Sequence, residues 1–218
     1  MTGIYRLVRI PDVVSLANSL LGFGSILMAF QERFSISVVL IILAAVADGL
    51  DGFLARRTGT GPLGLDLDSL ADLVSFGVAP AVLAWTAFGS WIWALGGVYL
   101  ICGILRLARF NVTASGEAFF QGIPITAAGT ILALSVLLDG LFLTTLLIVV
   151  LSALMISSVT YPKFRDLKYL PFAFLAVLAV LICWLVGDGN LWAVVAFLVL
   201  LGYMISPVVI TLCRRMER

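Results

Sequence analysis

Four aspartates at helical spacing stand out in an otherwise apolar sequence. Residues 48–72 read D-G-L-D-G-F-L-A-R-R-T-G-T-G-P-L-G-L-D-L-D-S-L-A-D. Asp48 and Asp51 are three residues apart and Asp68 and Asp72 are four apart, so each pair lies along one face of a helix. A single carboxylate near the middle of a bilayer costs roughly 2.5–3.5 kcal/mol, so four of them require a positive charge in their midst. The pattern therefore predicts a divalent-metal site that binds a phosphorylated substrate.

Two helices and a short turn must position these carboxylates. The first pair lies near the end of a helix predicted over 35–57, and the second pair lies in the first two turns of a helix predicted over 67–88. Glycines and a proline in residues 58–64 break the chain between them. Two antiparallel helices joined in this way would bring both pairs to one depth. Hard oxygen ligands of this kind suit Mg²⁺, Mn²⁺ or Ca²⁺ better than zinc.

The composition is typical of a protein that crosses a membrane several times. Of the 218 residues, 62% are hydrophobic and 11% are charged, and apolar runs long enough to span a bilayer recur along the chain. We therefore expect an all-α integral membrane protein with one domain over residues 1–218, since the loops are too short for a soluble domain. Only Asp139 and Gly140 separate the fifth predicted helix from the sixth. The eight predicted helices cover 14–31, 35–57, 67–88, 91–110, 123–139, 141–158, 170–187 and 190–213.

Basic residues predict the orientation in the membrane. With eight spans, nearly all of them fall on one side, and Arg33 alone falls on the other. The positive-inside rule then places both termini in the cytoplasm, with the acid-rich site opening toward it, and we expect the protein in the cell membrane. The residues on the cytoplasmic side are Arg6, Arg9, Arg56, Arg57, Arg106, Arg109, Lys163, Arg165, Lys168, Arg214, Arg215 and Arg218.

The remaining composition excludes several kinds of chemistry. The chain has no histidine, which rules out histidine-dependent mechanisms. Cys102, Cys183 and Cys213 are isolated in sequence, so we interpret them as small core residues and not as a disulfide or metal motif. We expect no nucleic-acid partner.

The motif at 48–72 resembles the signature of the CDP-alcohol phosphotransferases, D-x-x-D-G-x-x-A-R, a spacer, and G-x-x-x-D-x-x-x-D. The spacer between Arg56 and Gly64 has seven residues, where eight is commoner in the family. This difference falls in the turn, so we expect it to shift the loop and not the ligands. The matching residues are Asp48, Asp51, Gly52, Ala55, Arg56, Gly64, Asp68 and Asp72.

Two further stretches are similar to membrane-embedded phosphatidylserine synthases and to their archaeal relatives that make archaetidylserine. Residues 68–81 match the run D-S-L-A-D-x-x-S-F-G-x-A-P-A. A second motif, over 106–124, combines R-L-A-R-F-N with F-x-G-x-P. The resemblance runs from about residue 10 to residue 130 and implies a core of six helices with two added ones.

The resemblance implies transfer of a phosphatidyl group from a CDP-linked lipid to an alcohol, with release of CMP. Two divalent cations, Mg²⁺ or Mn²⁺, would neutralise the pyrophosphate. It implies Asp48, Asp51 and Asp68 as metal ligands, with Asp72 as a ligand of the second ion and as general base on the serine hydroxyl. The residues expected around CMP and its pyrophosphate are Gly52, Ala55, Arg56 and Gly64. Those expected near serine or a phosphate are Arg106, Arg109, Asn111 and Ser75, with Asn18 as a further polar candidate.

Several alternatives remain at this point. The same metal site could serve inositol phosphate or glycerol phosphate, but residues 112–122 carry no basic side chain to hold an acceptor's phosphate, which favours serine. A cation- or proton-coupled carrier would need carboxylates in both halves of the chain, whereas the acidic motif lies at one face. Arg106 and Arg109 could be positive-inside anchors, and Asp66 a solvated turn or N-cap residue. The sequence leaves open ester against ether lipid tails, Mg²⁺ against Mn²⁺, and the homodimer that the family implies.

Overall fold

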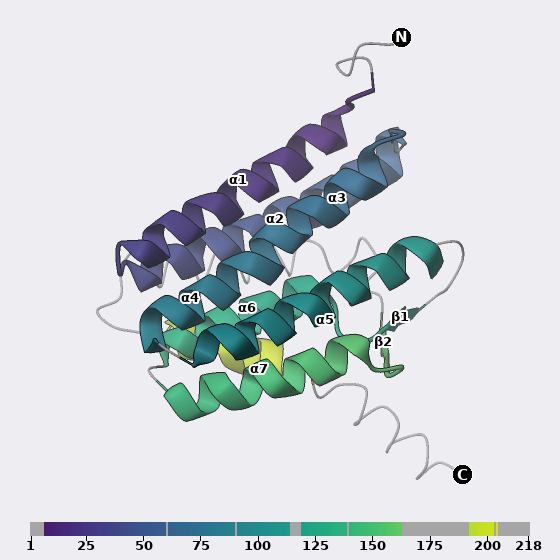
Figure 1. Ribbon diagram of the computed structural model, residues 1–218. Helices are drawn as coiled ribbons and strands as arrows, with labels where there is room; N and C mark the ends of the chain where they lie inside the picture. Colours follow the sequence, from purple (N-terminus) through teal and green to yellow (C-terminus); the bar gives the residue numbers. More distant parts are fainter. Residues whose placement is uncertain are drawn as a thin grey trace.

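The computed structural model describes residues 7–113 except Thr60 and Ser90, residues 119–162 except Asp139, and residues 192–202 and 204. Most of these residues lie in helices (Figure 1). A further short apolar helix covers Trp192–Gly202. The labelled elements are α1 (Ile10–Phe30), α2 (Phe34–Thr58), α3 (Gly64–Asp72), η2 (Leu73–Val78), α4 (Ala79–Phe88), α5 (Ile92–Thr113), β1 (Phe119–Gln121), α6 (Ile125–Leu137), α7 (Leu141–Ile156) and β2 (Thr160–Pro162).

Six of the predicted helices correspond to observed ones. The helix predicted over 67–88 is a single rod made of α3, the π-helical segment η2 and α4. The predicted break between the fifth and sixth helices is confirmed, because α6 ends at Leu137 and α7 begins at Leu141. The helix predicted over 170–187 lies outside the described residues, and only 192–202 and 204 of the one predicted over 190–213 are described.

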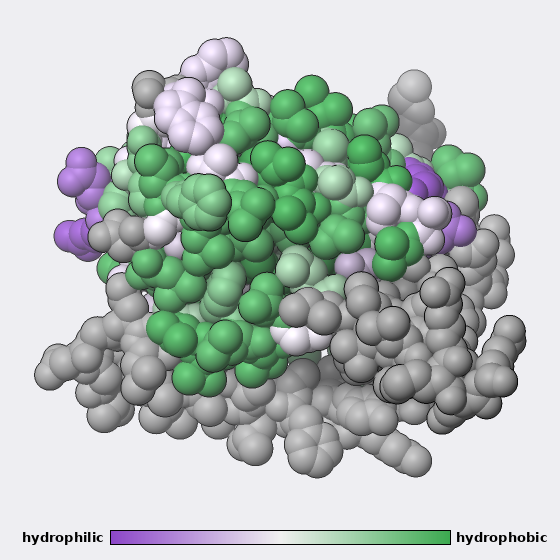
Figure 2. All heavy atoms as spheres, turned by 90° about the horizontal axis from the view of Figure 1, so that it is seen from below, coloured by the Kyte–Doolittle hydropathy of each residue, from purple (hydrophilic) through white to green (hydrophobic). Residues whose placement is uncertain are grey.

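Length and composition identify a membrane protein. Among the described residues, four helices are long and apolar enough to cross a bilayer, while α6 and α7 are shorter. Figure 2 shows a broad apolar surface with hydrophilic side chains gathered toward its two ends, as a membrane-embedded face requires. The four long helices cover Ile10–Phe30, Phe34–Thr58, Gly64–Phe88 and Ile92–Val112.

The helices run alongside one another as a bundle, with α6 in its interior. Figure 1 shows α1, α2 and the α3–α4 rod on one side of the bundle and α5 and α7 on the other. Every residue of α6 from 128 to 137 is buried. The chain reverses direction at each connection, so the end of α2, the start of α3 and the end of α5 lie together. Arg56, Arg57, Arg106 and Arg109 are therefore at this end, and Arg33 is at the opposite end.

Two helices approach the backbone of η2 closely enough to require glycine. A Cβ on Gly22 of α1 would lie 2.7 Å from the Cα of Ser75. A Cβ on Gly129 of α6 would lie 2.7 Å from the carbonyl oxygen of Phe76. Real Cβ atoms do not come this close to backbone atoms, so the two glycines set how tightly α1 and α6 hold the π-helical segment.

Hydrogen bonds from side chains also hold η2. The hydroxyl of Ser75 donates to the backbone carbonyl of Asn18 at 2.9 Å, and the hydroxyl of Tyr99 donates to the carbonyl of Phe76 at 2.9 Å. A π-helical turn displaces carbonyls from the regular helical ladder, and Tyr99 gives the carbonyl of Phe76 a donor. Because Asp72 immediately precedes η2, this packing fixes where the Asp72 side chain emerges.

One feature departs from the all-helical prediction. Strand β1 pairs antiparallel with β2, Phe120 standing opposite Tyr161. Three-residue strands are too short to show the alternating pattern by which strands are predicted. Gly122 follows β1 with a φ of 77°, and its N–H donates to the carbonyl of Val159 at 2.8 Å. The β1–β2 pair thus holds the segment that precedes α6 against the segment that follows α7.

Candidate active site

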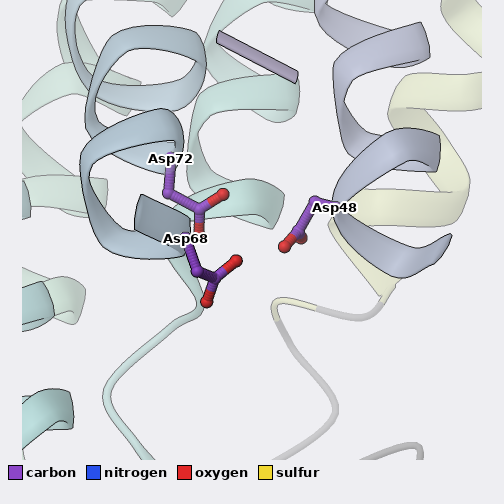
Figure 3. A group of neighbouring side chains, drawn as sticks. All are labelled: Asp48, Asp68 and Asp72. Carbon is purple, nitrogen blue, oxygen red and sulfur yellow. The ribbon is translucent and has the colours of Figure 1, made fainter. Parts of the chain in front are cut away.

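Three of the four predicted aspartates come together between α2 and α3. Asp48 lies on α2, and Asp68 and Asp72 lie on successive turns of α3. One carboxylate oxygen of each lies within 4.8 Å of the others, and the side chains point toward one another (Figure 3). We call Asp48, Asp68 and Asp72 the acid cluster.

Two other helices contact the acid cluster. The hydroxyl of Thr126, on α6, donates to Oδ2 of Asp48 at 3.0 Å. The side-chain amide of Asn18, on α1, donates to Oδ1 of Asp72 at 3.2 Å. The orientation of two carboxylates in the cluster is therefore fixed by residues far away in sequence.

Asp51 takes a different position from the other three aspartates. It lies one turn beyond Asp48 on α2, is only 4% exposed, and accepts a 2.7 Å hydrogen bond from the hydroxyl of Ser15. It does not belong to the group of carboxylates within 4.8 Å of one another. If Asp51 binds a metal ion, it does so from beside the acid cluster and not as a member of it.

The charge balance of the acid cluster suits a cation. The guanidinium of Arg106 interacts electrostatically with all three carboxylates. Arg106 is 6% exposed, and its guanidinium carbon lies 5.6 Å from the centre of the Phe110 ring. Three carboxylates outnumber this one guanidinium in a poorly solvated site, so a divalent ion bound by their oxygens would offset the excess negative charge. The cluster could thus hold a metal ion.

Arg109 is engaged in the architecture of the site. Its guanidinium donates to the backbone carbonyls of Met155, Ile156 and Ser157 at the end of α7, at 2.9, 3.2 and 3.0 Å. It also donates to the carbonyl of Gln121 at 2.7 Å. Arg109 thereby joins the end of α5 to α7 and to β1.

The second motif owes part of its pattern to this junction. A Cβ on Gly122 would lie 2.7 Å from Nη2 of Arg109 and 3.0 Å from the carbonyl oxygen of Leu154. The arginine and the glycine therefore fit one another, and Pro124 follows as the residue that precedes α6. These contacts explain why a glycine and a proline occupy their positions in the F-x-G-x-P segment.

The other predicted polar contacts have partners in the structure. Ser75 is fully buried, and its hydroxyl is bonded to the backbone of Asn18. The side-chain oxygen of Asn111 accepts a 3.0 Å hydrogen bond from the hydroxyl of Ser69. Asp66 is exposed in the first turn of α3, and Leu63 occupies the N-cap position, so Asp66 is a solvated residue.

The residues predicted around the nucleotide lie on the two helices of the acid cluster. Gly52 and Ala55 follow Asp48 by four and seven residues and so share its face of α2. Both are half-buried, whereas Arg56 is exposed near the end of the helix. Gly64 is the first residue of α3, on the far side of the turn. This arrangement leaves small side chains between the acid cluster and the end of the bundle.

Sequence reasoning did not identify Thr126 or Ser15. Each donates a hydrogen bond to one of the predicted aspartates. Each is a hydroxyl residue in an apolar helix, and a polar residue within a membrane-spanning segment is a reason to look for a partner. However, serine and threonine can also bond to the preceding helical turn, so this signal is not specific.

Comparison with known proteins identifies the family. The model of the CDP-alcohol phosphatidyltransferase family matches residues 8–161, which contain the acid cluster and both motifs. The chain belongs to this family, and the prediction of a CDP-alcohol phosphotransferase enzyme is confirmed. An ion-coupled carrier is thereby set aside.

Several relatives resemble most of the chain. An archaetidylserine synthase from Methanothermobacter thermautotrophicus is 37% identical over 169 residues, covering 73% of this chain and 72% of its own. A CDP-diacylglycerol–serine O-phosphatidyltransferase from Helicobacter pylori is 37% identical over 177 residues, covering 73% and 74%. The protein of that name from Bacillus subtilis is 34% identical over 163 residues, covering 72% and 91%.

Proposed function

We propose that this protein transfers the phosphatidyl group of a CDP-linked lipid to the hydroxyl of L-serine and releases CMP. The observation that carries the proposal is the convergence of Asp48, Asp68 and Asp72 on one point between two apolar helices. Relatives from archaea and bacteria that are named for serine transfer support the choice of acceptor.

The reaction makes one phosphorus–oxygen bond and breaks another. The serine hydroxyl attacks the phosphorus that carries the lipid, and the bond from this phosphorus to the oxygen of CMP breaks. A serine hydroxyl is a weak nucleophile, so its proton must pass to a nearby base as the new bond forms. We assign that role to Asp72, which is buried and is oriented by the amide of Asn18.

The four aspartates would hold two divalent cations, Mg²⁺ or Mn²⁺. When bound, such ions neutralise the charge of the pyrophosphate and align the displaced and attacking oxygens. Asp48, Asp68 and Asp72 would supply oxygen ligands from the acid cluster, and Asp51 would supply one from its position a turn away. Thr126 and Ser15 would keep the carboxylates of Asp48 and Asp51 in fixed orientations.

The remaining assignments follow the position of each side chain. Gly52, Ala55, Arg56 and Gly64 would surround the CMP moiety at the end of the bundle. We assign the carboxylate of serine to Arg106, because a buried guanidinium beside Asp72 can bind a carboxylate with two parallel hydrogen bonds. The hydrogen bonds of Arg109 to four backbone carbonyls favour a structural role for it instead.

We further propose that the protein lies in the cell membrane with the acid cluster at the cytoplasmic end of the bundle. The described arginines other than Arg33 lie at this end. The nucleotide and serine would then reach the site from the aqueous side. The lipid tails would remain among the apolar helices.

Release of CMP by the purified protein tests the proposed function. CDP-diacylglycerol and its ether-linked analogue would be supplied separately with Mn²⁺ or Mg²⁺, and serine, inositol phosphate and glycerol phosphate would be compared as acceptors. We expect CMP release with serine from at least one of the two donors. Release with a phosphorylated acceptor and not with serine would contradict the proposal and the role of Arg106.

A further inference from the structure

Asn18 is a buried polar side chain whose amide nitrogen makes a hydrogen bond and whose amide oxygen makes none among the described residues. It lies in the middle of the apolar helix α1 and is 0% exposed. Its Nδ2 donates to Oδ1 of Asp72 at 3.2 Å. In the ionised state that a general base or a metal ligand requires, the carboxylate of Asp72 can only accept, and the amide accordingly turns its nitrogen toward it. Its Oδ1 is buried and has no hydrogen-bond partner among the described residues.

The surrounding packing keeps this side chain in place. The backbone carbonyl of Asn18 accepts the hydroxyl of Ser75, and one turn later Gly22 packs against the backbone of the same serine. The segment of α1 that carries Asn18 is thus fixed to η2, directly after Asp72. A buried acceptor without a donor is unfavourable, so a site that retains one is suited to a ligand that brings the donor.

The chemistry of serine identifies this donor, given the proposed function. Oδ1 and Nδ2 belong to the same amide group, so Oδ1 also lies close to the carboxylate of Asp72. The hydroxyl of serine has a single hydrogen, which passes to Asp72. The other donor that serine brings is its ammonium group, which has three N–H bonds and lies on the adjacent carbon.

We propose that Asn18 recognises L-serine: its Oδ1 binds the ammonium group of serine while its Nδ2 holds the carboxylate of Asp72 toward the serine hydroxyl. Asn18 is then both a specificity residue and a positioning residue. Together with Arg106 and Asp72 it would match the three polar groups of serine, namely ammonium, carboxylate and hydroxyl. This inference rests on the proposed function and adds the recognition of the amine.

Two substitutions of Asn18 separate these roles by their effects on KM and kcat. Asn18→Leu removes both hydrogen bonds with little change in size, and we expect the KM for serine to rise about ten- to hundredfold and kcat to fall. Asn18→Asp keeps an oxygen for the ammonium group but loses the donor to Asp72. We therefore expect it to lower kcat and to leave the KM for serine within about threefold of the wild-type value.

A serine analogue without the amine provides a matched control. The Ki of 3-hydroxypropanoate, measured as a competitor of serine, should be the same in the wild type and in Asn18→Leu. Measured at saturating Mn²⁺, the KM for the CDP-linked lipid should also be unchanged. Ser25→Ala removes another buried side-chain hydrogen bond of α1, to Ser37, and should leave the KM for serine at its wild-type value. Asn18→Ala replaces the leucine variant if the latter does not give a monodisperse protein.

Two results would overturn the inference. One is a KM for serine in Asn18→Leu within about twofold of the wild type; the other is a parallel loss of affinity for 3-hydroxypropanoate. Failure of the proposed function itself would look different, because wild-type protein would then release CMP with a phosphorylated acceptor and not with serine. Asn18 would then have no serine ammonium group to bind.

Discussion

The hydroxyl of Thr126 donates a 3.0 Å hydrogen bond to Oδ2 of Asp48 and so connects α6 to the acid cluster. Asp48 itself comes from α2, Asp68 and Asp72 come from α3, and Asn18 reaches Asp72 from α1. Four helices thus determine the shape of a site whose three carboxylates come from only two of them. The positions of these oxygens depend on packing between segments that are distant in sequence.

Removing the hydroxyl of Thr126 should weaken metal binding. In Thr126→Val the carboxylate of Asp48 loses the donor that orients it, and loss of such an orienting partner typically costs 10- to 100-fold in metal affinity. Titration of the purified protein with Mn²⁺, followed by electron paramagnetic resonance, measures the change. Thr130→Val is the matched control, because its hydroxyl bonds to the backbone of Thr126, one turn earlier. Equal affinities in the two variants would contradict this role.

Filling the contact between α1 and η2 should destabilise the protein. In Gly22→Ala the new Cβ would lie 2.7 Å from the Cα of Ser75, and overpacking of this kind costs about 1–3 kcal/mol. We expect a lower Tm in detergent together with lower activity, because Asp72 directly precedes η2. Gly97→Ala is the control, since nothing lies within 4 Å of a Cβ at Gly97. A Tm for Gly22→Ala equal to that of Gly97→Ala would show that the helices separate without cost.

The two arginines of the second motif should respond differently to substitution. Arg109→Ala removes hydrogen bonds to four backbone carbonyls, so we expect a lower Tm and a KM for serine within about twofold of the wild-type value. Arg106→Ala removes a buried guanidinium beside the acid cluster, and we expect the KM for serine to rise about tenfold or more. Kinetics over a range of serine concentrations, with thermal melts of both variants, measure the contrast. The opposite pattern would assign serine to Arg109.

Much of the fold follows from the sequence because apolar length is a strong signal. The apolar runs of α1, α2, the α3–α4 rod and α5 are each long enough to cross a bilayer, and charged residues lie near at least one end of each. The acid-rich motif was equally visible, since carboxylates are rare in such helices. The prediction that Asp48 and Asp68 lie close together needed only a short turn between antiparallel helices.

Other features depend on contacts that no local pattern encodes. The π-helical turn at η2 is stabilised by Tyr99, which lies on another helix. The short strands β1 and β2 have no periodicity to detect, and the carbonyl contacts of Arg109 depend on where α7 ends. In the sequence Arg109 resembled a substrate-binding residue. Its environment in the fold favours a structural role.

Serine-dependent release of CMP by wild-type protein, Asp72→Asn and Asp66→Asn tests the central claim most directly. Asp66 is an exposed aspartate in the first turn of the same helix α3, so Asp66→Asn controls for loss of a carboxylate outside the acid cluster. We predict that wild type and Asp66→Asn release CMP only with serine, that EDTA stops both, and that Asp72→Asn is slower by roughly 10²- to 10⁴-fold. Release by Asp72→Asn at the wild-type rate, or release that persists without serine, would contradict the account.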